Sequence, residues 1–389
     1  MVQPASAQSA PGAGELHDWL ALLLAPGVGP HRLSALLAVH PEPASARQAP
    51  DSLLRELRFP SLAIRALREP EAARLDAALA WLDVPGHALL TRDDSRYPPA
   101  LRDLPDAPVA LFVSGEPARL REPLIGVVGS RHPTPGGIDN ALAFSRHLAG
   151  LGLGIVSGLA QGVDAAAHEG ALRAAGLTIA VLGTGPDIVY PAANRALAGR
   201  LLDAGGLLVS EFAPGTPPRR EQFPRRNRII SGLALGVLVV EASVQSGSLI
   251  TARLALEQGR EVFAIPGSIH NPLARGCHAL IRQGAKLVES AQDVLEELAP
   301  QLNVHPALAG GERPVSAPCH EAPDVPDPDY QNLLNAMGHD PVDIDTLIER
   351  SGLTAEVVSS MLLIMELDGR VHALPGGRVA LRSYTEIRP

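Results

Sequence analysis

The sequence predicts an α/β fold, in which a mainly parallel, doubly wound sheet lies between a small helical N-terminal domain and a C-terminal winged-helix domain. First, short apolar runs alternate with helical stretches over residues 86–298, the pattern of repeated βαβ units. Second, residues 15–85 have helical periodicity with little strand character. Third, residues 328–389 contain two helical stretches followed by two short apolar runs. A chain of 389 residues also exceeds one ordinary core, so several domains are expected.

Seven strands are expected in the central region, each bounded by Gly or Ser and separated by about 15–25 residues. They are Leu124–Val128, Gly154–Ser157, Thr178–Leu182, Leu207–Ser210, Val237–Glu241, Glu261–Ile265 and Lys286–Val288. Sheets of this kind bind ligands at the carboxyl ends of their strands. The loops that follow these strands are therefore the first place to look for a site.

The N-terminal part is expected to begin with a disordered segment at residues 1–14, which is rich in Ala, Ser, Gln, Pro and Gly. Within residues 15–85, Ala25–Pro30 reads Ala-Pro-Gly-Val-Gly-Pro between two apolar helical stretches. Two glycines around one hydrophobic residue predict a tight hairpin, and Pro30 suits a first helical turn. A helix-hairpin-helix unit that touches duplex DNA weakly and a plain turn are both compatible with this motif.

The C-terminal part follows a Pro-, Ala- and Gly-rich linker at residues 299–327. A helix beginning near Ile344 is followed by Gly352, by Thr354 as an N-cap, and by a second helix over residues 355–368. Two short strands around residues 375–377 complete a winged-helix pattern. From residue 319 to 389 there are twelve acidic and five basic residues, a net of 5 − 12 = −7. Such a charge would repel phosphates, so we expect a protein contact or a weak auxiliary DNA contact here.

Composition indicates a cytoplasmic protein without a metal site, a cofactor or a membrane anchor. The two cysteines, Cys277 and Cys319, are far apart and have no CxxC spacing, so neither a disulfide framework nor a zinc site is indicated. The apolar run Trp19–Ala25 is too short to span a membrane, and no later run reaches 18 residues. Lys286 is the only lysine, so any phosphate contact would come from a guanidinium fork.

An arginine-rich segment predicts a local anion site in a chain whose formal net charge is −9. Five arginines lie between Arg219 and Arg228, and Phe223 and Asn227 are interleaved with them. The segment follows one strand end and enters a helix, and arginines in a first helical turn oppose the helix dipole unless an anion binds among them. A solvated basic face is the alternative. The primary candidates in this segment are Phe223, Arg225, Arg226, Asn227 and Arg228, with Arg219 and Arg220 as secondary ones.

Glycine-rich turns at three other strand ends predict further phosphate contacts. Gly129-Ser130-Arg131 is followed by a loop and a helix start, whose free N–H groups attract anions. The motif is neither GxGxxG nor GxxxxGK[ST], so neither NAD nor a P-loop nucleotide is implied. Ser157 and Gly158 open the next turn, and Gly183-Thr184-Gly185 ends the third strand. On the helix after Gly158, Asp164 and His168 are spaced i,i+4. We expect a structural hydrogen bond between them, with an acid–base dyad or half of a metal site as the alternatives.

Hydroxyl groups mark one more strand end. Ser246, Gly247, Ser248 and Thr251 follow the fifth expected strand and enter a helix. They are secondary candidates for phosphate contact, and helix capping is the alternative role.

Taken together, these motifs resemble the DNA-processing protein A (DprA/Smf) family. The segments that carry the resemblance include VGSRHPTPGG, SGLAQGVDAAAHEGAL, FPRRNRIISGLALGVLVVEA and SGSLITARLALEQGREVFAIPG, within about residues 90–298. The resemblance implies an extended Rossmann domain, a SAM-like or helix-hairpin-helix N-terminal domain and a winged helix. It also implies a protein that is not an enzyme, that binds single-stranded DNA as a homodimer through the Rossmann domain, and that loads the RecA recombinase during natural transformation. The family's DNA-binding arginine falls on Arg131, and its FPxRNR segment on residues 223–228.

Two other functions are compatible with parts of the sequence. The extended Rossmann architecture also resembles nucleoside monophosphate phosphoribohydrolases, whose motif is PGGxGTxxE. Thr251 survives here, but Leu254 stands at the Glu position, so Glu211 or Glu241 would have to supply the acid. A sequence-specific transcription factor is the second rival, and the acidic winged-helix domain opposes it.

Overall fold

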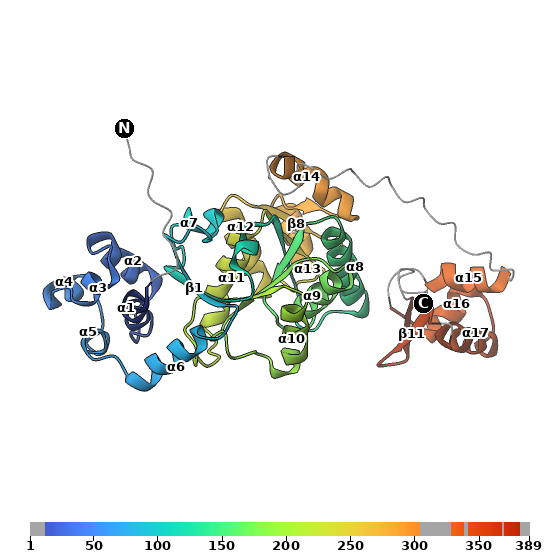
Figure 1. Cartoon of the computed structure of the whole chain (residues 1–389). Helices are drawn as coiled ribbons and strands as arrows, with labels where there is room; N and C mark the ends of the chain where they lie inside the picture. Colours follow the sequence, from blue (N-terminus) through green and yellow to red (C-terminus); the bar gives the residue numbers. More distant parts are fainter. Residues whose placement is uncertain (1–11, 304–327, 338–340, 368, 382–389) are drawn as a thin grey trace. The chain divides into compact units, whose positions relative to one another are not determined.

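The computed structural model describes residues 12–303, 328–337, 341–367 and 369–381. These residues fall into two compact units, residues 12–303 and 328–381, and each is described separately (Figure 1). Most of the expected disordered segment and most of the expected linker lie outside the described residues. At their margins the structure differs from the expectation, because α1 already begins at Ala13 and α14 continues to Asn303.

Six short helices form the N-terminal part of the first unit, as the periodicity predicted. They are α1 (Ala13–Leu23), α2 (Pro30–Val39), α3 (Pro43–Arg47), α4 (Asp51–Glu56), α5 (Ser61–Arg68) and α6 (Ala72–Leu82). Their apolar side chains form one cluster with residues of the sheet edge, including Leu89, Val109 and Phe112. The helices therefore share a hydrophobic core with that edge.

A nine-stranded sheet forms the centre of the first unit. Its order is β1-β2-β6-β5-β4-β3-β7-β8-β9, and the strands are β1 (His87–Thr91), β2 (Ala110–Ser114), β3 (Leu124–Val128), β4 (Gly154–Ser157), β5 (Thr178–Leu182), β6 (Leu207–Ser210), β7 (Gly236–Val239), β8 (Glu261–Ala264) and β9 (Lys286–Leu287). The strands β3 to β9 pair in parallel, whereas β1 and β2 are antiparallel to their neighbours.

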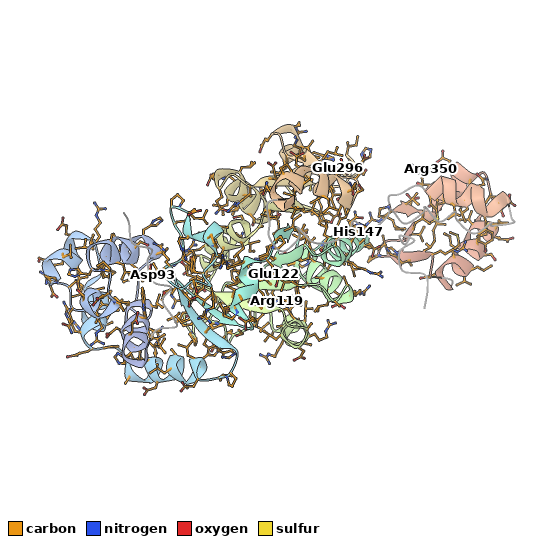
Figure 2. The ribbon with its side chains drawn as sticks, turned by 45° about the horizontal axis from the view of Figure 1, so that its top comes forward. Asp93, Arg119, Glu122, His147, Glu296 and Arg350 are labelled. Carbon is orange, nitrogen blue, oxygen red and sulfur yellow. The ribbon has the colours of Figure 1, made fainter. Side chains whose placement is uncertain are left out.

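All seven expected strands are present, and the α/β fold class is confirmed. The strands β3 to β6 have the expected bounds, whereas β7 begins one residue earlier and ends at Val239. The structure adds β1 and β2, which the sequence analysis did not list as strands. A 3-10 helix over Pro117–Arg121 connects β2 to β3. On it, Arg119 forms an ion pair of 3.0 Å with Glu122, and the two side chains come from the same turn of the chain (Figure 2).

Helices cover both faces of the sheet (Figure 1). They are α7 (Pro99–Arg102), α8 (Pro135–Gly150), α9 (Val163–Arg173), α10 (Arg195–Asp203), α11 (Gln222–Leu233), α12 (Ser248–Glu257), α13 (Arg275–Arg282) and α14 (Ala291–Asn303), with a 3-10 turn at Ala192–Asn194. Side chains of α11, α12 and α13 join the apolar cluster on one face. Those of α8, α9 and α14 join the cluster on the other face.

Residue alternation along the strands explains these two cores. In β3, Leu124 and Val128 belong to the cluster on the α11 face, whereas Ile125 and Val127 belong to the cluster on the α8 face. Since successive strand residues point to opposite faces, a strand that is apolar throughout is buried on both sides. The order in which strands are added to the sheet reverses at β3, because β4 to β6 lie on one side of it and β7 to β9 on the other. This switch point fixes where the loops converge.

The second unit has the expected winged-helix elements. They are α15 (Pro328–Met337), β10 (Val342–Asp343), α16 (Ile344–Ser351), α17 (Ala355–Leu367), β11 (Val371–Leu374) and β12 (Arg378–Leu381), with the three strands in the order β10-β12-β11. Asp343 caps α16 by accepting a 2.7 Å hydrogen bond from Thr346 N, and Gly352 ends it with a φ of 68°. No helix within the described ranges is long and apolar enough to cross a membrane.

Candidate nucleic-acid interface

A cluster near the carboxyl ends of β3 and β5 joins two loops with the first turn of α11. We call Arg131, Tyr190 and Phe223 the stacking platform. The ring centroids of Tyr190 and Phe223 lie 5.5 Å apart at an interplanar angle of 41°, and the Arg131 guanidinium carbon lies 5.8 Å from the Phe223 ring centroid. Arg131 is exposed and Tyr190 is 48% exposed. Aromatic faces and a guanidinium plane together suit a nucleic-acid strand, whose bases stack and whose phosphates are anionic.

Phe223 reaches this position because the strand end below it has no side chain. The Phe223 ring lies against Gly183, where an added Cβ would stand 2.8 Å from the ring. The aromatic ring is half-buried by this contact. The sequence pointed to Phe223 as a primary candidate of the arginine-rich segment but did not indicate Tyr190. The available signal was an aromatic residue in a strand-end loop of a chain that has only 3% aromatics.

The loop that carries Arg131 is fixed by the neighbouring turn. The carbonyl of Ser130 accepts a 3.1 Å hydrogen bond from Val163 N, and the Ser130 hydroxyl accepts one of 3.1 Å from His132 N. Gly129 allows this approach, because a Cβ there would lie 2.7 Å from a methyl group of Val163. Ser130 therefore shapes the loop, and Arg131 is its exposed cation.

Two of the expected phosphate contacts, Arg226 and Arg228, face the protein interior. Arg226 is 4% exposed. Its Nη1 donates to Gly158 O at 2.6 Å and to Val181 O, while its Nε has no partner within the described part of the chain. Burial lowers the pKa of Arg226 to about 10, although Asp164 favours its charged form. This guanidinium is a structural group that hydrogen-bonds the chain at the ends of β4 and β5, and it has no exposed surface for phosphate.

Arg228 belongs to an ion-pair network and is also 4% exposed. It pairs with Glu211 and, at 3.3 Å through Nε, with Asp106. Arg225 pairs with the same Glu211 at 3.0 Å and stacks over Phe212 at 5.2 Å. Arg225 is half-exposed, but its charge is already compensated.

The exposed cations of the arginine-rich segment are those outside the helix. Arg219 and Arg220 precede α11 and are exposed. The backbone N–H of Arg219 donates to the Gln222 side chain at 2.8 Å, which fixes the chain at the helix start. Asn227 is half-buried and its amide is 3.4 Å from Gly247 O. The two secondary candidates are thus more accessible than the buried primary ones.

The turn after β4 is built for internal contacts. Ser157 is fully buried, and its hydroxyl donates to Val127 O at 2.7 Å. A Cβ on Gly158 would stand 2.2 Å from Arg226 Nη1, so this glycine makes room for the buried guanidinium. Leu159 has a φ of 57°, an unusual conformation for a residue with a side chain. The expectation of phosphate contacts from Ser157 and Gly158 is revised accordingly.

Asp164 and His168 are both buried, but the expected hydrogen bond between them is not present. His168 Nδ1 lies 2.7 Å from the Thr178 hydroxyl, and Asp164 accepts a 3.3 Å hydrogen bond from Ala160 N. Burial lowers the pKa of His168 to about 3 and raises that of Asp164, against the lowering effect of Arg226. Both residues support the turn, and no group of three or more His, Cys, Asp or Glu residues in the described ranges could hold a metal ion.

The hydroxyl groups before α12 act as a helix start. The Ser246 and Ser248 hydroxyls lie 2.7 Å apart, and Ser246 accepts a 3.3 Å hydrogen bond from Ser248 N. Gly247 is exposed, whereas Thr251 is 1% exposed. Gly247 is the N-cap of α12, and Ser246 before it hydrogen-bonds the first residue of the helix. Thr251 is not available to a ligand.

Sequence comparison decides the family. The model of the family DNA recombination-mediator protein A matches residues 88–299, and that of the DprA winged helix domain matches residues 317–377. The chain is 45% identical over 314 residues to Protein Smf of Escherichia coli, which covers 81% of this chain and 83% of that protein. The chain belongs to the DNA recombination-mediator protein A family.

Other members of the recombination-mediator family show the same relationship. DNA processing protein DprA of Streptococcus pneumoniae is 52% identical over 209 residues, which cover 52% of this chain and 72% of that protein. Its X-ray structure matches with a TM-score of 0.63 and covers 72% of this chain and 97% of the other. A Helicobacter pylori DNA processing protein A structure, described for its single-stranded DNA binding mode, matches with a TM-score of 0.50 and 30% identity, over 55% of this chain and 96% of the other.

Within this recombination mediator, the two carboxylates that an enzyme would need are already engaged. Glu211 is held by Arg225 and Arg228. Glu241 accepts hydrogen bonds from the backbone N–H of Thr134 at 2.8 Å and from its hydroxyl at 2.7 Å. A general acid or base must reach a substrate proton, and neither carboxylate is free to do so in this arrangement.

Proposed function

We propose that this protein binds single-stranded DNA at the stacking platform, protects incoming DNA and loads the RecA recombinase onto it during natural transformation. The observation that carries the proposal is the exposed convergence of Arg131, Tyr190 and Phe223 at the strand ends. Membership in the recombination-mediator family and the single-stranded DNA binding mode described for the Helicobacter pylori relative support it.

The chemistry of the platform suits a strand of any sequence. The guanidinium of Arg131 can pair with a phosphate through two parallel hydrogen bonds, and every base has a face that can stack on Phe223 or Tyr190. Phosphate contacts carry no base code. We therefore propose binding that is largely independent of sequence and that prefers single strands, whose bases are free to stack.

We propose a role without enzymatic activity. Leu254 stands where the phosphoribohydrolase motif has its acid, and Glu211 and Glu241 are both engaged with internal partners. These features weigh against a nucleoside monophosphate phosphoribohydrolase. Release of free base from nucleoside monophosphates by the purified protein would contradict this part of the proposal.

We propose that the homodimer forms near the free edge of the sheet at β9. Two large apolar side chains are exposed in this part of the domain, Leu287 of β9 at 47% and Ile269 of the loop between β8 and α13 at 73%. Burial of such side chains is the usual driving force for association. RecA is proposed as a partner from the family resemblance, without a contact assigned to individual residues.

The N-terminal hairpin is proposed as an auxiliary contact to DNA. Gly29 and Pro30 line a cleft of about 100 Å³ together with Arg74 and Arg225. Arg74 lies on α6 and is exposed, whereas the charge of Arg225 is compensated by Glu211, so Arg74 is the cation proposed to contact duplex DNA weakly beside the hairpin. Arg74→Ala should weaken duplex DNA binding, whereas the matched variant Arg55→Ala, on the exposed surface of α4, should not.

The proposed function is tested by fluorescence anisotropy with labelled single and double strands of the same sequence. Arg131→Ala and Phe223→Ala should each lower single-strand affinity by about tenfold or more, since a hydrogen bond to a charged group contributes about 1.5–3 kcal/mol and a stacked base about 1–3 kcal/mol. Arg146→Ala, an exposed arginine on α8, is the matched control. Wild-type affinity in both platform variants would overturn the site. RecA-filament assembly on strands coated by a competing single-strand binding protein tests the loading step.

A further inference from the structure

Glu241 occupies the start of helix α8 from a distant part of the chain. It follows β7, and its carboxylate accepts hydrogen bonds from Thr134 N (2.8 Å), Thr134 Oγ1 (2.7 Å) and Asn271 Nδ2 (3.3 Å). The Thr134 hydroxyl also accepts a 3.0 Å hydrogen bond from Gly137 N, which leaves its proton free for Glu241. The glutamate is 8% exposed. One buried carboxylate thus joins the loops after β3, β7 and β8.

This position is where doubly wound sheets bind a phosphate. The helix that follows the first parallel strand begins at the switch point of the sheet, and the positive end of its dipole favours an anion there. Here the carboxylate fills that space: a Cβ on Gly137 would lie 2.6 Å from the carboxyl carbon of Glu241. Gly137 gives close access to the helix start, and the group that uses this access is the chain's own glutamate.

We propose that Glu241 is a built-in replacement for a nucleotide phosphate, and that it makes the site select a polynucleotide strand over free mononucleotides. With the helix start occupied, the anion of a ligand has to bind further out, at the exposed Arg131. A mononucleotide offers Arg131 one phosphate and one base, whereas a strand offers successive phosphates and bases to the whole platform. Glu241 also acts as a positioning residue, because Thr134 lies three residues after Arg131 in the same loop.

Removal of the carboxylate should expose a phosphate site that the wild-type protein lacks. We expect Glu241→Ala to bind inorganic phosphate at least about tenfold more tightly than the wild type in isothermal titration calorimetry. The same variant should show a saturable rise in Tm with phosphate, since a ligand that binds only the folded state stabilises it. Glu257→Ala, which removes an exposed glutamate from α12, is the matched control and should behave like the wild type. Adenosine monophosphate is the second probe.

A second variant separates charge from size. Glu241→Gln keeps the volume and loses the charge, so it should lower the Tm without creating a phosphate site. If Glu241→Ala does not fold, Glu241→Gln decides, because wild-type stability in that variant would show that the anion at the helix start is unimportant. A folded Glu241→Ala without phosphate binding would also overturn the proposal. These readouts do not involve DNA, so their failure is distinguishable from failure of single-strand binding.

Discussion

Arginine residues of this chain have opposite roles although they lie close together. The guanidinium of Arg131 is exposed beside an aromatic ring, while that of Arg226 is buried against two backbone carbonyls. A buried cation must be compensated by hydrogen bonds and charge, or its transfer from water is very unfavourable. Arg226 is thus a structural residue, and of these two arginines only Arg131 is exposed and can exchange water for phosphate.

Replacement of Arg226 should affect stability. Arg226→Ala leaves the carbonyls of Gly158 and Val181 without this donor and removes the cation near the buried Asp164. We expect the free energy of unfolding in urea to fall by about 1–3 kcal/mol, the usual penalty for an unsatisfied buried polar group. Arg220→Ala, an exposed arginine six residues earlier, should leave it unchanged. Equal stability of the two variants would contradict the structural role.

Protonation of His168 should destabilise the fold. Burial, with a further contribution from Arg226, lowers the pKa of His168 to about 3, so the unfolded chain takes up this proton first. The contribution of the neutral imidazole is complete above about pH 6.5 and is lost as the pH falls toward 3, by up to about 1.4 kcal/mol per pH unit. The raised pKa of Asp164 acts in the opposite sense, so the difference between two proteins must be measured.

That difference is the wild-type unfolding free energy minus that of His168→Gln, from urea titrations between pH 7 and pH 4. The glutamine can still bond to Thr178 but cannot take up a proton, so the difference should shrink on acidification. His147→Gln, on the exposed side of α8 (Figure 2), should show no such trend. A pH-independent difference for His168→Gln would be incompatible with a buried neutral imidazole.

At the scale of elements, helix α11 shows what the sequence could have revealed. Its buried stripe contains Gln222, Arg226, Ile229, Ile230 and Leu233, which follow the i, i+4, i+7, i+8, i+11 spacing of one helix face. Helical periodicity therefore placed Arg226 on the apolar side. Counting the five arginines together suggested an exposed basic cluster, because such a count does not consider which face of the helix each arginine occupies. Arg228 is harder to predict, because its partners Glu211 and Asp106 come from distant loops.

The strands show the same limit. The parallel strands β3 to β8 were predictable because each is a short, largely buried apolar run, whereas both residues of β9 are exposed. The antiparallel strands β1 and β2 lie near Pro-rich connections and depend on pairing with each other and with β6. Pairing between strands that are distant in sequence is a tertiary effect. For the same reason, the meeting of Tyr190 with Phe223 could not be deduced from spacing.

The aromatic pair of the platform leads to a prediction about the loop after β5. Tyr190→Ala should lower single-strand affinity by several-fold, because a stacked base contributes about 1–3 kcal/mol. Tyr190→Phe should retain the affinity, since stacking requires the ring and not the hydroxyl. Both variants are compared by anisotropy with the same labelled strand. If Tyr190→Phe lost as much affinity as Tyr190→Ala, the tyrosine would act through its hydroxyl and the stacking role would be wrong.

At the scale of the whole molecule, charge is segregated between the two units. The chain has a net charge of −9, and residues 319–389 account for −7 of it. Helix α17 has no basic residue and exposes Val357, Leu363 and Ile364. A winged helix that reads DNA presents basic residues to phosphates. The surface of α17 instead has the apolar composition of a protein contact, so under the proposed function we expect the first unit to bind the phosphates.

The salt dependence of DNA affinity reports how many cations of the first unit contact phosphates of a bound DNA strand. The sequence alone suggested four clasping arginines, Arg131, Arg225, Arg226 and Arg228, and hence a slope of log K against log [salt] near −3 for single strands. The structure leaves Arg131, Arg219 and Arg220 exposed and uncompensated by the ion pairs described above, so we expect a slope of about −2 per bound protomer.

The change of this slope in arginine variants identifies which arginines contact phosphate more directly than the absolute slope does. Arg131→Ala should reduce the magnitude of the slope by about 0.7, and the double variant Arg219→Ala, Arg220→Ala by about 1.4. The reason is that fewer counterions are released from the DNA when fewer phosphates are contacted. Arg226→Ala, measured where it is still folded, should leave the slope unchanged. The measurement is a series of anisotropy titrations from low to moderate salt, with Arg146→Ala as control. If Arg226→Ala reduced the slope as Arg131→Ala does, the Arg226 guanidinium of the wild type would have to leave the interior on binding. The DNA strand would then bind at the carboxyl ends of β4 and β5.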